Sequence, residues 1–271
     1  MGDVEDRAIG VLVGLAAGDR VGGPIRMALR VAESLRDRGE FDPSDIGRRY
    51  LDWWSEGAVD TGPTVARVLS LAASGLPFDQ AATRVDQLTG GMTAGCNPAH
   101  RAAPLAMCAA LPDDGLARAA LAEALLTHRN RLAGDVAAAV VCLCRALIRG
   151  VAWQAALEWA ADGRGPETRR ALATNSPRLL SRDGFAPNVL AAAVYFVGAS
   201  SAFPEALTLS VEFAGRPNYC PVLVGSIGGA RWGRAGIEES SLAHPRALLQ
   251  EVEAVARDLA GPWAPDRPTP A

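Results

Sequence analysis

The chain has 271 residues, of which 49% are hydrophobic, so it can bury a large core without needing a disulfide or a metal to hold it together. Its net charge is only −3, and all 27 basic residues are arginines scattered among carboxylates, with no lysine. This distribution argues against a nucleic acid or a membrane surface as the partner.

Apolar residues recur at helical spacing along the whole chain, whereas the alternation of β-branched residues typical of strands is nearly absent. The pattern predicts an all-α fold with one domain over residues 1–261. The expected helices, with ends uncertain by ~2 to 4 residues, cover residues 5–18, 25–38, 43–55, 61–74, 77–88, 99–110, 115–128, 133–149, 151–161, 167–174, 187–199, 203–214, 219–231 and 245–260.

Turn-forming residues mark the predicted breaks between these helices. Glycine and proline stand at 22–24, 39, 57, 75–77, 90–91, 150 and 163–166. Asp42 followed by Pro43 is typical of a helix N-cap with proline at the first helical position. The tail over residues 262–271 is rich in proline, and we expect it to be disordered.

The cysteines and the N-terminus indicate a reducing compartment. Five cysteines occur, an odd number without Cys-x-x-Cys spacing, and the first residues, MGDVEDRAIG, are acidic where a signal peptide is basic. We therefore expect a cytoplasmic protein. The most apolar run, residues 137–147, contains Arg145 and is shorter than the roughly 20 residues of a membrane span, so it predicts a buried helix.

Polar and glycine residues gather in four loops between the predicted helices. These loops cover residues 18–24, 60–64, 95–101 and 215–220. A helix N-terminus presents unpaired N–H groups and a partial positive charge, so several of them converging would bind an anion such as a phosphate. For any one loop, the alternative is a helix cap followed by a tight turn.

The order and spacing of several segments resemble the ADP-ribosylglycohydrolase family, which includes the dinitrogenase reductase activating glycohydrolase. The matching stretches are residues 9–19 (IGVLVGLAAGD), 27–29 (MAL), 32–35 (AESL), 60–64 (DTGPT), 101–106 (RAAPLA), 127–128 (TH) and 225–233 (GSIGGARWG). The resemblance implies a compact multi-helix orthogonal bundle. It also implies cleavage of N- or O-glycosidic bonds to ADP-ribose, with two magnesium ions held by a Thr-Asp-Asp and a later Asp-x-Asp-Thr.

The sequence departs from this family at those magnesium ligands. The Thr-Asp-Asp positions fall on Gly22, Gly23 and Pro24, and the segment that separates the first two matched stretches in the family is missing. The second group falls on Arg216, Asn218 and Tyr219. Magnesium needs hard oxygen ligands and is repelled by a guanidinium, so we expect no magnesium cofactor and no metal ligands in this chain.

The residues left in the loops favour a site for a small anionic or ADP-ribose-like ligand. Arginine suits phosphate or carboxylate recognition. Asp60 is a candidate general base or a partner for a ribose hydroxyl, with a helix N-cap as the alternative. The candidate ligand-binding residues are Asp19, Arg20, Arg26, Thr61, Asn97, Arg101, Arg216 and Tyr219.

A cysteine and histidine set allows a different chemistry. Cys96 or Cys220 with His100 would form a thiolate and imidazole pair, with Asn218 as the orienting amide. Together with Asp60 these are the candidate catalytic residues. The alternative is that both cysteines are buried and inert, and that His100 is a histidine with satisfied hydrogen bonds. For His128 the dipole of the preceding helix is a sufficient explanation.

These observations leave three functions open. The leading hypothesis is an ADP-ribosylglycohydrolase-like protein whose metal-free pocket binds, and hydrolyses or otherwise transforms, a small anionic or nucleotide-like ligand. The first alternative is a noncatalytic pseudoenzyme that serves as a binding or regulatory module. The second is a cysteine-dependent enzyme. The sequence identifies neither the substrate nor the oligomeric state.

Overall fold

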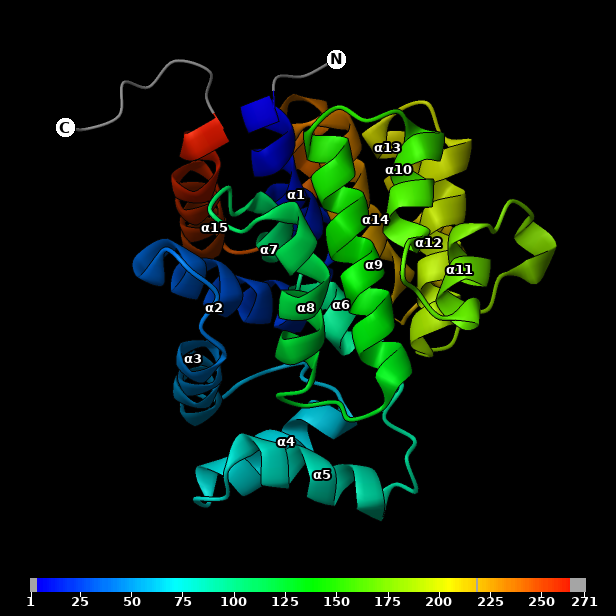
Figure 1. Cartoon of the computed structure of the whole chain (residues 1–271). Helices are drawn as coiled ribbons and strands as arrows, with labels where there is room; N and C mark the ends of the chain where they lie inside the picture. The colour runs from blue at the N-terminus through cyan, green and yellow to red at the C-terminus, as the bar shows by residue number, and fades with distance from the viewer. Residues whose placement is uncertain (1–3, 218, 264–271) are drawn as a thin grey trace.

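The computed structural model describes residues 4–217 and 219–263, and within them it confirms the all-α prediction (Figure 1). The α-helices are α1 (Val4–Gly18), α2 (Gly23–Arg38), α3 (Pro43–Ser55), α4 (Pro63–Ala73), α5 (Phe78–Leu88), α6 (Asn97–Arg101), α7 (Pro104–Met107), α8 (Asp113–Ala124), α9 (Arg131–Ile148), α10 (Trp153–Ala161), α11 (Pro166–Leu172), α12 (Ala186–Ala199), α13 (Phe203–Ala214), α14 (Cys220–Trp232) and α15 (Arg246–Ala260). Short 3-10 turns cover Pro177–Leu179, Arg234–Gly236, Glu239–Ser241 and Gly261–Trp263.

Most helix ends lie close to the predicted ones, because the turn residues terminate the helices as expected. Asp42 caps α3, its side chain accepting hydrogen bonds from the N–H groups of Ser44 at 2.9 Å and Asp45 at 3.0 Å. The helix predicted over residues 99–110 is wrong. It is divided into α6 and α7, since Pro104 has no N–H to continue the ladder of hydrogen bonds.

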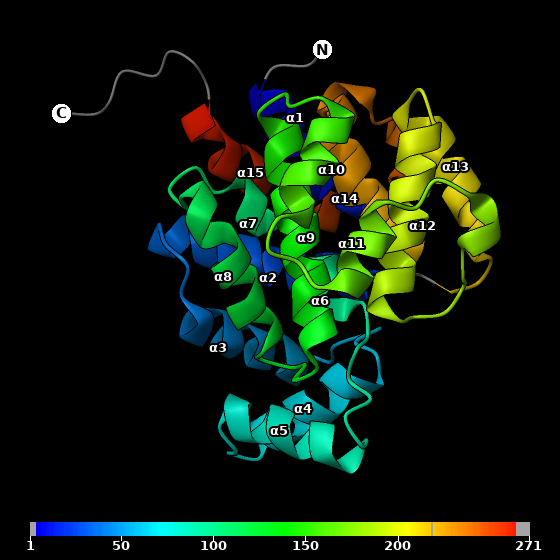
Figure 2. The ribbon, with the colours of Figure 1, turned by 45° about the vertical axis from the view of Figure 1, so that its right-hand side comes forward.

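The helix α9 runs through the middle of the bundle (Figures 1 and 2) and packs against α6, α8, α10 and α14. Its residues from 136 to 148 are all buried, as expected for the most apolar run of the chain. Arg145 is buried among them, and it donates hydrogen bonds to the carbonyl oxygens of Ala106 and Cys108 and to the carboxylate of Asp113.

The pair α4 and α5 forms a helical hairpin at one end of the molecule (Figures 1 and 2). Its own small core consists of Val68, Ala72, Ala81, Ala82 and Val85. The hairpin is flanked by the segments 56–62 and 89–96, both of which contribute to the cleft described below.

The packed part of the chain includes Trp263, which lies within the tail expected to be disordered. Trp263 donates its indole N–H to the carbonyl oxygen of Met107 at 2.6 Å. The guanidinium of Arg145 lies 5.0 Å from the centre of its ring, and that of Arg149 lies 5.4 Å from it. Trp263 is therefore held against the bundle, and residues 264–271 of the predicted tail lie outside the described part of the chain. In that described part, no helix combines the length and apolar character needed to cross a membrane.

The closest helix pair is α1 with α14, whose backbones touch. Gly10, Gly14 and Gly18 recur every four residues on α1 and face, in that order, Gly229, Gly225 and Pro221 of α14. A methyl group at Gly14 would overlap the carbonyl oxygen of Gly225, and one at Gly229 would overlap that of Gly10. Because the obstructing atoms are backbone atoms, no side chain can move away to make room.

We therefore expect Gly14→Ala to lower the free energy of unfolding by at least about 2 kcal/mol, through overpacking of this helix pair. The matched control is Gly115→Ala in α8, where the nearest atom to the new methyl group, Pro112 Cγ, lies at an ordinary 3.4 Å. The control should be neutral or stabilising by up to about 1 kcal/mol. Urea unfolding of both variants measures the difference, and equal midpoints would contradict close helix packing.

Candidate functional site

All four polar loops predicted from the sequence contribute to one cleft of about 530 Å³. This volume lies in the usual range for small-molecule sites. The cleft is lined by Val21, Pro24, Asp60, Thr61, Gly62, Pro63, Thr64, Val65, Met92, Gly95, Cys96, Asn97, His100, His128, Gly184, Arg216, Pro217 and Tyr219.

The turn after α1 and the loop before α14 are joined by hydrogen bonds. Arg20 donates to the carbonyl oxygens of Gly215 at 2.8 Å and Pro217 at 2.7 Å. The buried carboxylate of Asp19 accepts from the N–H groups of Val21, Gly22 and Ile25 at 3.0, 2.8 and 2.9 Å. Asp19 therefore caps the start of α2, and Arg20 holds the second loop in place.

Three residues predicted to bind a ligand are accordingly not on the wall of the cleft. Asp19 and Arg20 make the contacts just described, and neither lines the cleft. Arg26 turns back to donate to the carbonyl oxygen of Gly22 at 2.8 Å and is also absent from the lining. Asp19 and Arg26 shape the turn between α1 and α2, and Arg20 joins this turn to the loop before α14, so a role of these side chains in ligand binding stays a prediction.

Asp60 lies on the cleft wall in an unusual backbone conformation. Its φ of 51° is the only positive φ outside glycine in the described residues. A side chain at Gly23 would overlap the carbonyl oxygen of Asp60, so this glycine allows the close approach of the two segments. Helix α4 begins only at Pro63 with Gly62 as its cap, so the interpretation of Asp60 as a helix N-cap is wrong.

Beneath the cleft lies a buried ion pair between Arg101 and Glu123, with Nε and Oε1 2.7 Å apart and both side chains fully buried. Tyr50 donates its hydroxyl to the same Oε1 at 2.7 Å. The other guanidinium nitrogens donate to Asn97 Oδ1 and Thr127 Oγ1, each at 2.8 Å. Arg101 does not line the cleft, because its charge is paired with Glu123 in the interior, and its predicted contact with a ligand stays a prediction.

The network around Arg101 fixes residues that do line the cleft. Asn97 accepts from Arg101 and donates through Nδ2 to the carbonyl oxygen of Thr61 at 3.0 Å. This bond ties the segment before α4 to the start of α6. Asn97 and Thr61 therefore keep their predicted places at the site, with much of their polar capacity already used within the protein.

Two buried histidines line the cleft, and both are neutral near pH 7. Burial lowers the pKa of His100 to about 4, partly offset by Asp19, and the Nε2 of this residue has no hydrogen-bond partner in the described chain. Burial and, next, the charge of Arg101 lower the pKa of His128 to about 3. Stabilisation by a helix dipole requires a charged imidazole, so the lowered pKa of His128 argues against that interpretation.

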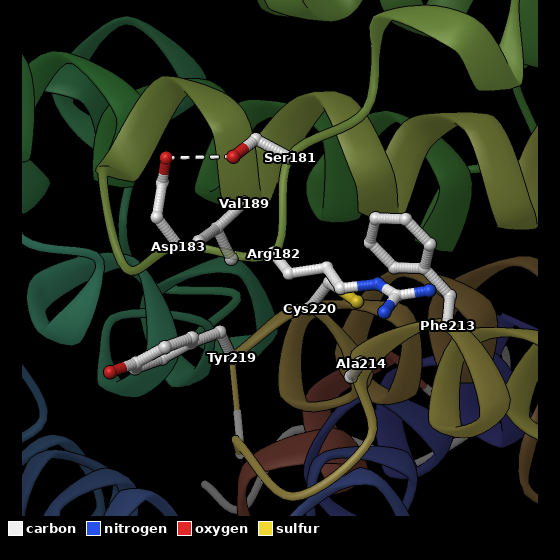
Figure 3. Close-up of a pocket in the computed structure, with 8 residues that line it drawn as sticks. All are labelled: Ser181, Arg182, Asp183, Val189, Phe213, Ala214, Tyr219 and Cys220. Carbon is white, nitrogen blue, oxygen red and sulfur yellow. Dashed lines mark hydrogen bonds between the residues drawn. The ribbon is translucent and has the colours of Figure 1, made fainter.

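The cysteines do not support a thiolate site. Cys96 lines the cleft, whereas Cys220 lies in a separate hollow of about 10 Å³ beside Arg182 and Phe213, too small for more than a water molecule (Figure 3). Burial raises the pKa of both thiols to about 12. A protonated thiol beside a neutral imidazole is no activated nucleophile.

The remaining predicted residues divide between the cleft and the undescribed part of the chain. Arg216 is exposed on the same cleft as Asp60 and makes no hydrogen bond or ion pair with another described residue. Tyr219 lies on the wall of the cleft with its ring against Gly184. A Cβ added to Gly184 would stand only 3.1 Å from Cζ of the tyrosine ring. Asn218 is not among the described residues.

Val21, Met92 and His128 are among the lining residues that the sequence analysis did not select as candidates. Val21 is 53% exposed and Met92 is 81% exposed at the cleft, and no pattern in the sequence distinguished them from ordinary loop residues. For His128 a signal was available in the sequence, because residues 127–128 are one of the stretches that resemble the family. Together these residues give the cleft an apolar component beside its polar wall.

If the thiols are inert, iodoacetamide at pH 7.5 should alkylate Cys96 and Cys220 at least about 100-fold more slowly in the folded protein than in urea, since the thiolate is the reacting form. The variants Cys96→Ser and Cys220→Ser identify the two sites by peptide mass. If either cysteine were labelled as fast in the folded protein as in urea, the hypothesis of a cysteine-dependent enzyme would be supported again.

A family profile and a solved structure both relate this chain to the same family. The family profile for ADP-ribosylglycohydrolase matches residues 1–268. A solved structure titled ADP-ribosylglycohydrolase-related protein complex is 28% identical and superposes with a TM-score of 0.78, covering 96% of this chain and 99% of that one. No curated protein sequence matches the chain.

Proposed function

Because this chain belongs to the ADP-ribosylglycohydrolase family, we propose that its cleft binds an ADP-ribose-like ligand without the magnesium pair that the family resemblance implies. The observation that carries this proposal is the composition of the cleft. Arg216 supplies a positive charge with no ion-pair partner among the described residues, which also contain no group of three or more histidine, cysteine, aspartate or glutamate side chains arranged to hold a metal ion.

The residues at the expected magnesium positions do not fit that ion. Gly22, Gly23 and Pro24 have no side-chain oxygen, and the carbonyl oxygen of Gly22 already accepts from the guanidinium of Arg26. Magnesium requires near-octahedral oxygen coordination, and a guanidinium close by opposes any cation. Arg216 places a positive charge on the wall of the cleft itself.

The shape and chemistry of the cleft support a nucleotide-like ligand. A diphosphate carries the charge that a guanidinium fork recognises, which gives Arg216 its role. Asp60 offers carboxylate oxygens to ribose hydroxyls. Val21, Met92 and Tyr219 provide exposed apolar surface for a flat base. The ligand is thus held by one cation, one anion and a partly apolar rim.

Binding without turnover is the function that this geometry favours. Cleavage of a glycosidic bond needs a group that protonates the leaving atom or a metal that stabilises it. His100 and His128 have pKa values of about 4 and 3, and the Cys96 thiol has one of about 12. None of these groups is poised to deliver a proton near pH 7.

One observation favours hydrolysis as a second candidate. Asp60 is the carboxylate in the cleft lining, its backbone is left-handed, and its carbonyl oxygen lies so close to Gly23 that a side chain there would overlap it. Backbone strain of this kind often accompanies function. In this candidate Asp60 removes a proton from water as the water attacks the anomeric carbon, and the leaving group takes its proton from solvent.

Calorimetric titration with ADP-ribose tests the binding proposal. We expect binding of similar strength in EDTA and in magnesium, and an affinity at least about 10-fold lower in Arg216→Ala, which corresponds to roughly 1.4 kcal/mol. The matched control is Arg246→Ala, another exposed arginine away from the cleft. An affinity that depends on magnesium, or equal losses in both variants, would contradict the proposal.

Release of ADP-ribose from O- and N-linked ADP-ribosyl compounds distinguishes the two candidates. Asp60→Asn removes the carboxylate charge but keeps a residue type that tolerates the left-handed conformation. We expect no release by the wild type. Release that is lost in Asp60→Asn, with ADP-ribose binding retained, would instead establish hydrolysis.

A further inference from the structure

His128 occupies an unusual position at the cleft, because its side chain is almost completely buried and yet lines the cavity. It is 3% exposed, and its Nδ1 lies 2.8 Å from the hydroxyl oxygen of Thr127. That hydroxyl oxygen also accepts a hydrogen bond from Arg101 at 2.8 Å. Arg101 in turn is held by Glu123 and Asn97.

The direction of these hydrogen bonds follows from their chemistry. A guanidinium can only donate, so the Thr127 oxygen is an acceptor toward Arg101. Within the described residues, the Thr127 hydroxyl makes one other hydrogen bond, the one with His128 Nδ1. If Nδ1 carried the proton, the hydroxyl hydrogen would be left buried without an acceptor, which is unfavourable.

We infer that the buried Arg101 and Thr127 pair fixes His128 as the tautomer with its proton on Nε2, so that the cleft presents a neutral N–H donor to an acceptor oxygen of the ligand. Arg101 and Thr127 are then positioning residues, and His128 is the group that contacts the ligand. The inference about the tautomer stands alone, whereas the identity of the acceptor, a phosphate or carbonyl oxygen, rests on the proposed function.

Two features keep this donor available. Burial and the neighbouring Arg101 hold the pKa of His128 at about 3, so the imidazole remains neutral under ordinary conditions. Gly95 has no side chain over the ring. A Cβ at that position would stand 3.5 Å from Nε2, at ordinary contact distance and without overlap. Replacing this glycine by alanine therefore covers the donor with little distortion of the backbone.

Nitrogen-15 NMR of the full chain, labelled in histidine, tests the tautomer directly. The chain contains three histidines, and His128→Gln assigns the signals of interest. We expect a pyrrole-like shift for Nε2 of His128 and a pyridine-like shift for Nδ1. The reverse assignment in the wild type would overturn the inference, and the variant serves only to identify the His128 signals in the spectrum of the wild type.

A matched pair of variants tests the role of the hydroxyl. Thr127→Ser keeps the hydroxyl and should keep the Nε2 tautomer. Thr127→Val removes it at nearly the same volume, and we expect the shifts of both ring nitrogens to move toward a mixture of tautomers. Unchanged shifts in Thr127→Val would mean that the hydroxyl does not set the tautomer. A merely structural contribution of Thr127 would alter stability without altering these shifts.

Gly95→Ala tests the contact with the ligand. We expect the tautomer of His128 to be unchanged and the affinity for ADP-ribose to fall at least about 10-fold. Unchanged affinity would show that the Nε2 donor is not used. If the wild type bound no ADP-ribose, the proposed function would fail while the NMR result still decided the tautomer.

Discussion

The contact between α1 and α14 is the constraint on which the rest of the structure depends. Glycines on both helices allow the two backbones to touch, which places the C-terminal end of α1 beside the N-terminal end of α14, where Gly18 meets Pro221. The turn at residues 19–24 and the loop at 215–219 therefore start from adjacent points, and Arg20 joins them through the carbonyl oxygens of Gly215 and Pro217. Two walls of the cleft come directly from this packing.

A second layer of organisation comes from the buried pair of Arg101 and Glu123. A buried ion pair stabilises little in net terms, because removing two charges from water is costly. Its effect here is geometric, since the fixed guanidinium holds Asn97 on one side and Thr127 on the other. The charges of Arg101 and Glu123 are thus confined beneath the cleft, and the cleft itself presents neutral imidazoles with Asp60 and Arg216.

The sequence predicted the helices well because apolar spacing and turn residues are local signals, as at α3 and α13. It also predicted the four loops that meet at the cleft. It failed on which side chains face the cavity. Arg101 and Arg216 look alike in sequence, but the first is paired with Glu123, 22 residues away on α8, and such tertiary pairing has no local signal. The same reason explains the packing of Trp263 against Met107.

The central claim is that a cleft of this family has lost its cation site and recognises its ligand through protein groups alone. Crystals grown with ADP-ribose and manganese, examined by anomalous scattering at the manganese edge, test it most directly. We predict ligand density in the cleft with an oxygen in hydrogen-bond contact with Arg216, and no manganese peak within the cleft. A manganese peak coordinated there beside Asp60 would contradict the claim.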